Sequence, residues 1–237
     1  YDIVSVVIED SVTSIGNEAF DRCVSLTSIT IPDSVTTIGD EAFYYCKSLT
    51  SIILPDGVTS IGDRAFYWCD SLTSITIPDS VTSIGDSAFS CCYSLTDINV
   101  NSKNKYYASE DGVLFNKDKS VLILYPKGKT VKEYSILDSV TTIGNDAFFN
   151  CLSLTSIIIT DSVTTIGDNA FSYCYGLTSV TISDSVTSIG DYAFSDCESL
   201  TSITIPNNVT TIGKKVFSSC HGLTSITIPD SVTTIGY

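Results

Sequence analysis

Residues 60–89 read SIGDRAFYWCDSLTSITIPDSVTSIGDSAF, and the stretch nearly repeats itself: IGDRAF at 61–66 returns as IGDSAF at 84–89. The repeated pattern is LTSITIPDSVTSIGxxAFxxCxS, and its phenylalanine recurs every 23 residues in two series. A constant period of this length indicates an array of stacked structural repeats. The phenylalanines are Phe20, Phe43, Phe66, Phe89, Phe148, Phe171, Phe194 and Phe217.

Each repeat is predicted to contain a short strand, a turn, a second short strand and a short helical turn. In the first strand, LTSITI, the apolar Leu26, Ile29 and Ile31 alternate with hydroxyl side chains that face away. Pro-Asp-Ser then turns the chain, and Gly39 permits a tight corner at the end of VTTIG. One repeat cannot bury its apolar residues alone, so the pattern predicts a solenoid of parallel strands. Ten repeats open at Ile3, Leu26, Leu49, Leu72, Leu95, Val131, Leu154, Leu177, Leu200 and Leu223.

One repeat departs from the period, because the spacing from Leu95 to Val131 is 36 residues. Within it, GVLFN (112–116) and SVLILYP (120–126) flank the polar sequence KDK, which predicts a β-hairpin. Residues 101–136 carry seven of the twelve lysines and arginines against four acids. This basic, hairpin-bearing repeat is suited to a lid, a spacer or a contact surface, and the pattern does not decide among them.

The composition excludes several classes of partner. The net charge of −15 argues against nucleic acid and against anionic membranes, because an acidic surface repels phosphate. No apolar run approaches the ~20 residues that span a bilayer. The chain begins at Tyr1 without a signal peptide and stops within a repeat. We therefore interpret residues 1–237 as a single solenoid domain that is a piece of a longer protein.

The repeat LTSITIPDSVTSIGDxAFxxC closely resembles the BspA-like leucine-rich repeats, and DGVLFNKDKSVLILYPKGK resembles a longer hairpin-bearing repeat of that family. The resemblance covers essentially the whole chain and implies a leucine-rich-repeat solenoid. It also implies a secreted or cell-surface protein of a host-associated microbe. Several family members are adhesins for extracellular-matrix proteins or other cells. The family supplies no catalytic residues, so we expect no enzyme and no cofactor.

Eight of the nine cysteines share one repeat position. Two functional interpretations are a series of disulfide bonds between neighbouring repeats and a column of metal-binding thiolates. The spacing matches no zinc pattern, and in-register side chains run parallel instead of converging as disulfides require. We expect free, buried thiols that act as small apolar groups. Cys91 falls at an outward position, where we expect an accessible thiol. The in-register residues are Cys23, Cys46, Cys69, Cys92, Cys151, Cys174, Cys197 and Cys220.

Aspartates recur at two repeat positions, in the Pro-Asp-Ser turn and after the glycine. Stacked carboxylates can bind Ca²⁺, but each aspartate also suits a local turn or cap. No DxDxDG loop occurs, so the repeat itself is the better explanation and we predict no metal site. His221 is the only histidine, and no nucleophile or carboxylate partner is indicated for it. No GxSxG, HExxH or P-loop pattern occurs.

The positions around the predicted helical turn vary among repeats, and aromatic residues gather there on three adjacent repeats. Tyrosine and tryptophan with polar tips are common anchors of protein and sugar contacts. The alternative is that these rings only cover the edge of the neighbouring layer. The candidate binding residues are Tyr44, Tyr45, Tyr67, Trp68 and Tyr93, with Lys117 and Lys119 of the hairpin.

The sequence therefore predicts an extracellular, adhesin-like module that binds a protein of the host or of a neighbouring cell, such as an extracellular-matrix protein. A structural spacer that projects another domain is one alternative. A glycan-binding module that uses the aromatic residues is the other.

Overall fold

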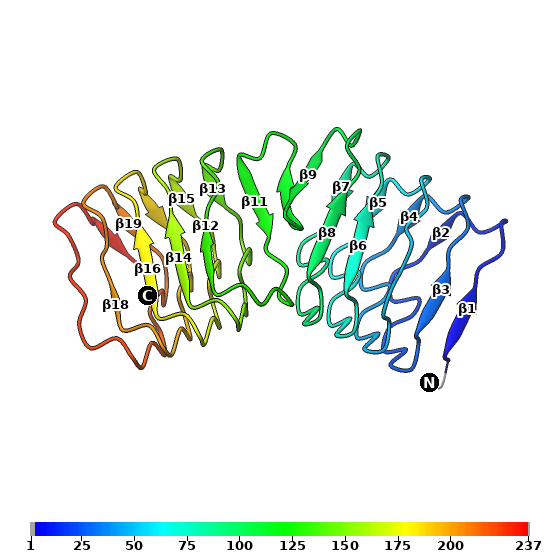
Figure 1. The fold of residues 1–237 in the computed structure, drawn as a ribbon, viewed down its shortest axis with the longest axis horizontal. Helices are drawn as coiled ribbons and strands as arrows, with labels where there is room; N and C mark the ends of the chain where they lie inside the picture. The colour runs from blue at the N-terminus through cyan, green and yellow to red at the C-terminus, as the bar shows by residue number, and fades with distance from the viewer. Residues whose placement is uncertain (1–2, 237) are drawn as a thin grey trace. The chain divides into compact units, whose positions relative to one another are not determined.

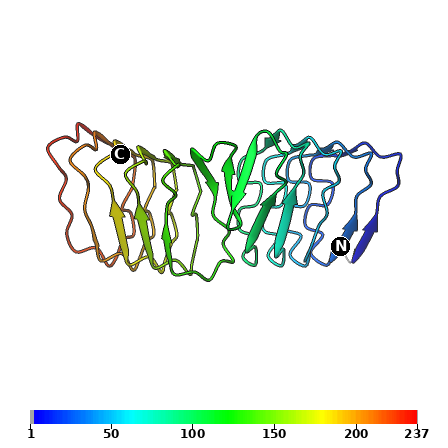
Figure 2. The same cartoon turned by 45° about the horizontal axis from the view of Figure 1, so that its top comes forward.

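The computed structural model describes residues 3–236, which fall into two compact units. The first unit comprises the chain up to Lys117 together with Pro126–Lys129, and the second comprises Asp118–Tyr125 and the chain from Thr130 onward. Each unit is a β-solenoid in which equivalent strands of successive turns lie side by side (Figures 1 and 2). The interpretation of residues 1–237 as one domain stays a prediction.

In the first unit, parallel strands pair with a register of 23 residues. Ser5 pairs with Ser28 and Ser74 with Asp97 on one side of the solenoid, while Ile15, Ile38, Ile61 and Ile84 form one column on the other. The first side contains β1 (Ser5–Val7), β3 (Ser28–Thr30), β6 (Ser74–Ile77) and β8 (Asp97–Val100); the second contains β2 (Ser14–Ile15), β4 (Thr37–Ile38), β5 (Ser60–Ile61) and β7 (Ser83–Ile84).

The second unit repeats this arrangement with two parallel ladders. Ser156 pairs with Ser179, and Ile143 pairs with Ile166. The first ladder contains β12 (Glu133–Ser135), β14 (Ser156–Ile159), β16 (Ser179–Ile182) and β18 (Ser202–Ile203). The second contains β11 (Val121–Leu124), β13 (Thr142–Ile143), β15 (Thr165–Ile166), β17 (Ser188–Ile189), β19 (Thr211–Ile212) and β20 (Thr234–Ile235).

The irregular repeat supplies strands to both units. Both predicted strands are present, as β10 (Val113–Asn116) and β11. β10 pairs antiparallel with β9 (Tyr107–Glu110), a strand that the pattern did not predict, around a turn in which Asp111 and Gly112 have φ of 48° and 73°. β11 belongs to the parallel ladder of the second unit, in which it pairs with β13.

The predicted helical turn is wrong, because no helix occurs among residues 3–236 and this part of each repeat is a series of turns. Every second backbone N–H group in this segment donates its hydrogen bond to the next repeat. Glu41 donates to the carbonyl of Asp63 and Phe43 to that of Ala65, both at 2.8 Å. Glu41 and Tyr45 have φ of 53° and 60°. These inter-turn bonds take the donors that an α-helix needs within its own segment. No helix long and apolar enough to cross a membrane is present in the described residues.

Stacked rings form the centre of each unit, as the repeat predicts. The Phe43 and Phe66 ring centroids lie 5.2 Å apart, and the rings are nearly parallel and fully buried. In the second unit Tyr125 occupies the place of the phenylalanine and stacks on Phe148 at 5.0 Å. The glycine is required at its corner, since a Cβ on Gly62 would lie 2.5 Å from the backbone nitrogen of Asp40. Adjacent turns therefore approach too closely for any side chain there.

All nine cysteines are free and buried. The inward placement is confirmed for the eight in-register cysteines, but the prediction of an accessible Cys91 is wrong. Cys91 is only 3% exposed. Its Sγ lies 3.8 Å from the Nζ of Lys127, which reaches it from the end of the irregular repeat and is itself buried. The inserted repeat thus covers a position that faces outward in other repeats.

Candidate protein-binding surface

Four of the five predicted aromatic residues, Tyr44, Tyr45, Tyr67 and Trp68, form a contiguous group of rings on the turns of the first unit. Tyr44 stacks on Tyr67 with centroids 5.5 Å apart, and Trp68 meets Tyr45 edge-on at 5.1 Å. Trp68 also contacts Tyr67 at 5.6 Å. We call Tyr44, Tyr45, Tyr67, Trp68 and Tyr93 the first aromatic cluster.

The backbone conformation and the hydrogen bonds between repeats fix the positions of these rings. Tyr45 and Trp68 both have φ of 60°, which turns their side chains away from the core. The N–H of Tyr45 donates to the carbonyl of Tyr67 at 2.8 Å, so the two turns are held in register. A fixed backbone of this kind presents large side chains with little further loss of entropy on binding.

Cys91 lies at the buried side of the first aromatic cluster, near the hydroxyl groups of Tyr67 and Tyr93. Burial, followed by a hydrogen bond with the Cys91 thiol, raises the pKa of Tyr67. Burial and the same thiol also raise the pKa of Tyr93. Tyr93 is 38% exposed. The other four aromatic residues are half-buried. Part of the cluster therefore packs on its neighbours, and part of it faces solvent.

Charged groups at the margin of the first aromatic cluster are paired internally. The Nζ of Lys47 lies 4.3 Å above the Tyr45 ring and 3.4 Å from a carboxylate oxygen of Asp70. A hydrogen bond with the Tyr45 hydroxyl, together with the Asp70 carboxylate, raises the pKa of Lys47. Arg64 pairs with Glu41 at 3.2 Å.

The two hairpin lysines of the candidate site lie in different units. The Nζ of Lys117 donates to the backbone carbonyls of Asn104 and Ser102, so it supports the segment before β9. The carbonyl of Lys119 accepts a hydrogen bond from the Ser139 hydroxyl in the second unit. Their grouping with the first aromatic cluster stays a prediction. Another lysine of this repeat, Lys127, contacts Cys91 beside the first aromatic cluster. The position of Lys127 in the sequence does not predict this contact.

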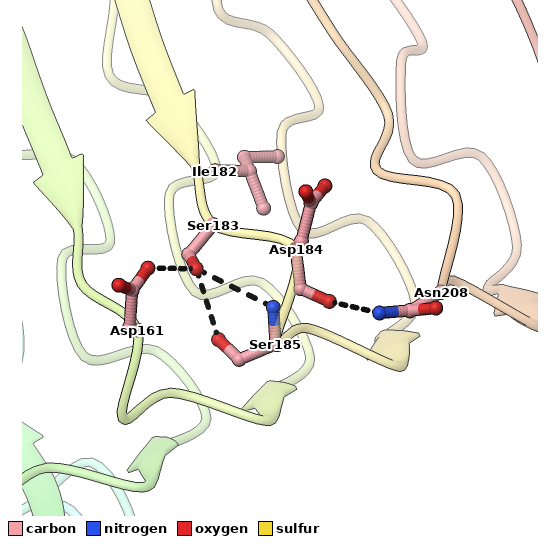
Figure 3. Close-up of a pocket in the computed structure, with 6 residues that line it drawn as sticks. All are labelled: Asp161, Ile182, Ser183, Asp184, Ser185 and Asn208. Atoms are coloured by element: carbon pink, nitrogen blue, oxygen red, sulfur yellow. Dashed lines mark hydrogen bonds between the residues drawn. The ribbon is translucent and has the colours of Figure 1, made fainter.

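A polar hollow of about 600 Å³ lies at the turns of the second unit (Figure 3). Ser183 donates from its hydroxyl to Asp161 and accepts the N–H of Ser185, and Asn208 donates to the backbone carbonyl of Asp184. The hydrogen-bonding groups in this hollow thus join neighbouring turns to each other. No group of three metal-ligating side chains occurs among residues 3–236.

A second group of rings, which we did not predict, lies on the turns of the second unit. Phe149 meets Tyr173 edge-on at 5.3 Å, and Tyr173 meets Tyr175 at 6.0 Å. Leu152, Tyr173 and Tyr175 are 49%, 38% and 40% exposed. We call Phe149, Leu152, Tyr173 and Tyr175 the second aromatic cluster. The signal was present in the sequence, because these residues occupy the same variable repeat positions as the first cluster.

Comparison with known proteins assigns the family. Residues 2–111 and 126–237 match the model of the BspA type leucine-rich repeat region, in six copies. The chain belongs to this family. The internal segment of the BspA-type chain between the two matched ranges, 112–125, contains β10 and β11. No curated protein matches it.

Solved structures similar to this BspA-type chain are bacterial leucine-rich proteins. A leucine-rich cell surface protein from Faecalibacterium prausnitzii A2-165 is 34% identical, with 99% of this chain and 73% of that one aligned and a TM-score of 0.77. The pneumococcal vaccine antigen PcpA is 26% identical over 98% of this chain and 65% of its own, with a TM-score of 0.84. A leucine-rich repeat protein from Eubacterium ventriosum ATCC 27560 is 29% identical over 99% and 81%, with a TM-score of 0.68.

Proposed function

We propose that this chain is a secreted or cell-surface, adhesin-like module that binds a protein of the host or of a neighbouring cell. The first aromatic cluster is its contact surface. The observation that carries the proposal is that large rings occupy positions where other repeats have small residues. The place of Trp68 is taken by Ser219 in a later repeat, and the place of Tyr67 by Ser195. The solenoid therefore does not need these rings to form.

The composition of the cluster favours protein recognition. Tyrosine and tryptophan are enriched among the residues that contribute most to protein–protein affinity, and the mutual stacking of Tyr44 with Tyr67 orders them before a partner arrives. The paired charges of Lys47 and Asp70 give the cluster a polar rim that needs no counter-charge from the partner. The surface location is supported by the similar Faecalibacterium protein, which is a leucine-rich cell surface protein.

The proposal is tested by measuring the binding of the purified chain to a panel of immobilised extracellular-matrix proteins and to intact epithelial cells. The test variant combines Tyr45→Ser with Trp68→Ser, because serine is tolerated at this repeat position with φ of 57° at Ser219. The control is Tyr106→Ser, which removes a 51% exposed tyrosine outside the cluster. Thermal unfolding of all three proteins checks the fold.

We expect the double variant to bind more than tenfold more weakly, which is about 1.4 kcal/mol, and Tyr106→Ser to bind like the parent. Unchanged affinity of the double variant for a validated partner would refute the cluster as the contact. Binding of no panel protein or cell would favour the spacer function, and binding confined to a glycan array would favour the glycan-binding function.

A further inference from the structure

The second aromatic cluster lies beside two acidic residues, Asp196 and Glu198. Asp196 follows Tyr173, and Glu198 follows Tyr175, at the same repeat positions one turn further along. The N–H of Tyr173 donates to the carbonyl of Ser195 at 2.9 Å, so the turns that carry these residues are adjacent. Neighbouring turns of a parallel ladder lie ~4.8 Å apart. Rings and carboxylates therefore form one surface.

Backbone geometry gives this surface a defined shape. Tyr173 and Asp196 have φ of 60° and 58°, which turns both side chains outward. The N–H of Tyr175 donates to the carbonyl of Tyr173 at 2.9 Å, a tight turn that brings the two rings to one corner. Leu152 extends the apolar part of the surface on the preceding turn and is 49% exposed.

The charges on this surface are not neutralised within the described part of the chain. Among residues 3–236, no lysine or arginine lies within 4.0 Å of the carboxylates of Asp196 or Glu198. Within the described residues, the hydrogen bond to the Asp196 carboxylate comes from the neutral Ser195 hydroxyl, at 2.6 Å. In the first unit, by contrast, Asp70 at the repeat position of Glu198 is paired with Lys47. Burial, followed by the charges of Asp196 and Glu198, raises the pKa of Tyr175.

We propose that the second aromatic cluster, with Asp196 and Glu198, binds a cationic segment of a partner protein that carries arginine or lysine. A guanidinium or ammonium group placed over the face of Tyr173 or Tyr175 gains a cation–π interaction. The same group reaches the carboxylates one turn away and forms charge-assisted hydrogen bonds. Leu152 and Phe149 receive the aliphatic part of the cationic side chain. This partner chemistry differs from that of the first cluster, so the two proposals stand on separate residues.

The experiment titrates a fluorescently labelled peptide of five Arg-Gly repeats into the full chain and measures its anisotropy at physiological salt. One variant removes the charges (Asp196→Asn with Glu198→Gln), and one removes the rings (Tyr173→Ser with Tyr175→Val). Serine and valine occupy these two repeat positions at Ser219 and Val24. The charge control is Asp138→Asn with Asp230→Asn, two exposed aspartates of the same unit. A fourth variant, Tyr173→Phe with Tyr175→Phe, keeps the ring faces.

We expect both test variants to bind the peptide at least tenfold more weakly. The charge control is expected to change affinity less than twofold, and the phenylalanine variant to bind like the parent. An equal loss in the charge control would overturn the proposal, because it would show only diffuse attraction to an acidic chain. Unchanged binding by either test variant would also overturn it. Thermal unfolding identifies any variant that loses its fold. If the Tyr173→Ser with Tyr175→Val variant is unfolded, the proposal is judged on the Asn/Gln variant and the phenylalanine variant, which change the side-chain volume little.

Discussion

The Sγ of Cys69 lies 3.2 Å from the backbone carbonyl oxygen of Phe43, the residue that carries the stacked ring of the preceding turn. The same relationship joins Cys46 to Phe20 and Cys92 to Phe66 in the first unit. In the second unit it joins Cys174, Cys197 and Cys220 to the phenylalanines of the turns before them. Each thiol thus fills a small buried space and donates a weak hydrogen bond to the preceding turn. Burial raises the pKa of Cys69 well above its ordinary value.

Thiol labelling tests this arrangement. When the native protein is treated with iodoacetamide at pH 8, all nine cysteines, Cys91 included, should stay unmodified, because the reagent does not reach buried thiols. The same treatment in denaturant should modify all nine, which intact-mass spectrometry counts directly. Rapid modification of Cys91 in the native protein would show that Lys127 and the irregular repeat do not cover it.

Alkaline pH should destabilise the protein through the same thiols. Burial raises the pKa of Cys46 and of Cys92 from 9.0 to about 12. Below pH 9 these thiols are protonated in both the folded and the unfolded chain, so their contribution to stability is complete. As the pH rises from about 9 toward 12, only the unfolded chain releases the protons, and each such thiol lowers the free energy of unfolding by ~1.4 kcal/mol per pH unit.

Urea titrations between pH 7 and 11 measure this dependence. The control is the variant Cys46→Ala with Cys92→Ala, in which the free energy of unfolding should fall less steeply above pH 9 because two of the titrating groups are gone. Lysines and tyrosines titrate equally in both proteins, so the difference in slope isolates the thiols. Identical slopes would contradict a buried, protonated state for these cysteines.

Much of the fold could be predicted because each repeat must satisfy the same contacts as its neighbours. The inward places of Phe66 and Cys69 followed from their constant 23-residue spacing, and both are fully buried. The helical turn could not be predicted correctly, because apolar spacing does not reveal that the N–H of Phe43 bonds to Ala65 on the next turn. The burial of Cys91 depends on Lys127, 36 residues away, and local pattern carries no information on that contact.

The candidate site was predictable to a similar extent. Comparing repeats with each other identified Tyr44, Tyr45, Tyr67 and Trp68, and these rings do lie together. The same comparison should have selected Tyr173 and Tyr175. Three adjacent aromatic repeats drew attention to the first group, whereas exposure and unpaired acidic neighbours distinguish the second, and only the structure provides those properties.

The aspartates after the glycine should contribute to stability in a way that asparagine can replace. The Oδ1 of Asp63 accepts the backbone N–H of Asp86 at 2.8 Å, and Asn17 and Asn145 make the same bond at 2.9 Å in other repeats. Asp63→Ala should lower the free energy of unfolding by about 1 kcal/mol, while Asp63→Asn should match the parent in urea titrations. Asp79→Ala, at an exposed turn, is the control and should change it by less than ~0.5 kcal/mol. A loss in Asp63→Asn equal to that in Asp63→Ala would mean that the carboxylate charge matters and not the acceptor.

The buried Asn104 should be indispensable for the first unit, because it links the solenoid to the β9–β10 hairpin. Its Nδ2 donates to the carbonyls of Pro78 and Val81 at 2.7 and 3.0 Å, and its Oδ1 accepts the N–H groups of Tyr106 and Tyr107 at 2.8 and 2.9 Å. Asn104→Ala leaves these four backbone groups without their partner and should cost on the order of 3 kcal/mol. Asn104→Asp keeps the acceptor but turns a carboxylate toward two carbonyls, so it should be no better.

Urea unfolding followed by tryptophan fluorescence measures the effect in the right place, because the only tryptophan, Trp68, lies in the same unit. Asn99→Ala is the matched control, since that asparagine is exposed on β8 and should shift the free energy of unfolding by less than ~0.5 kcal/mol. A loss below about 1 kcal/mol for Asn104→Ala would show that water replaces the amide, which needs a site open to solvent. Asn104 is fully buried, so we expect the larger loss, and with it a hairpin whose attachment to the solenoid depends on one side chain.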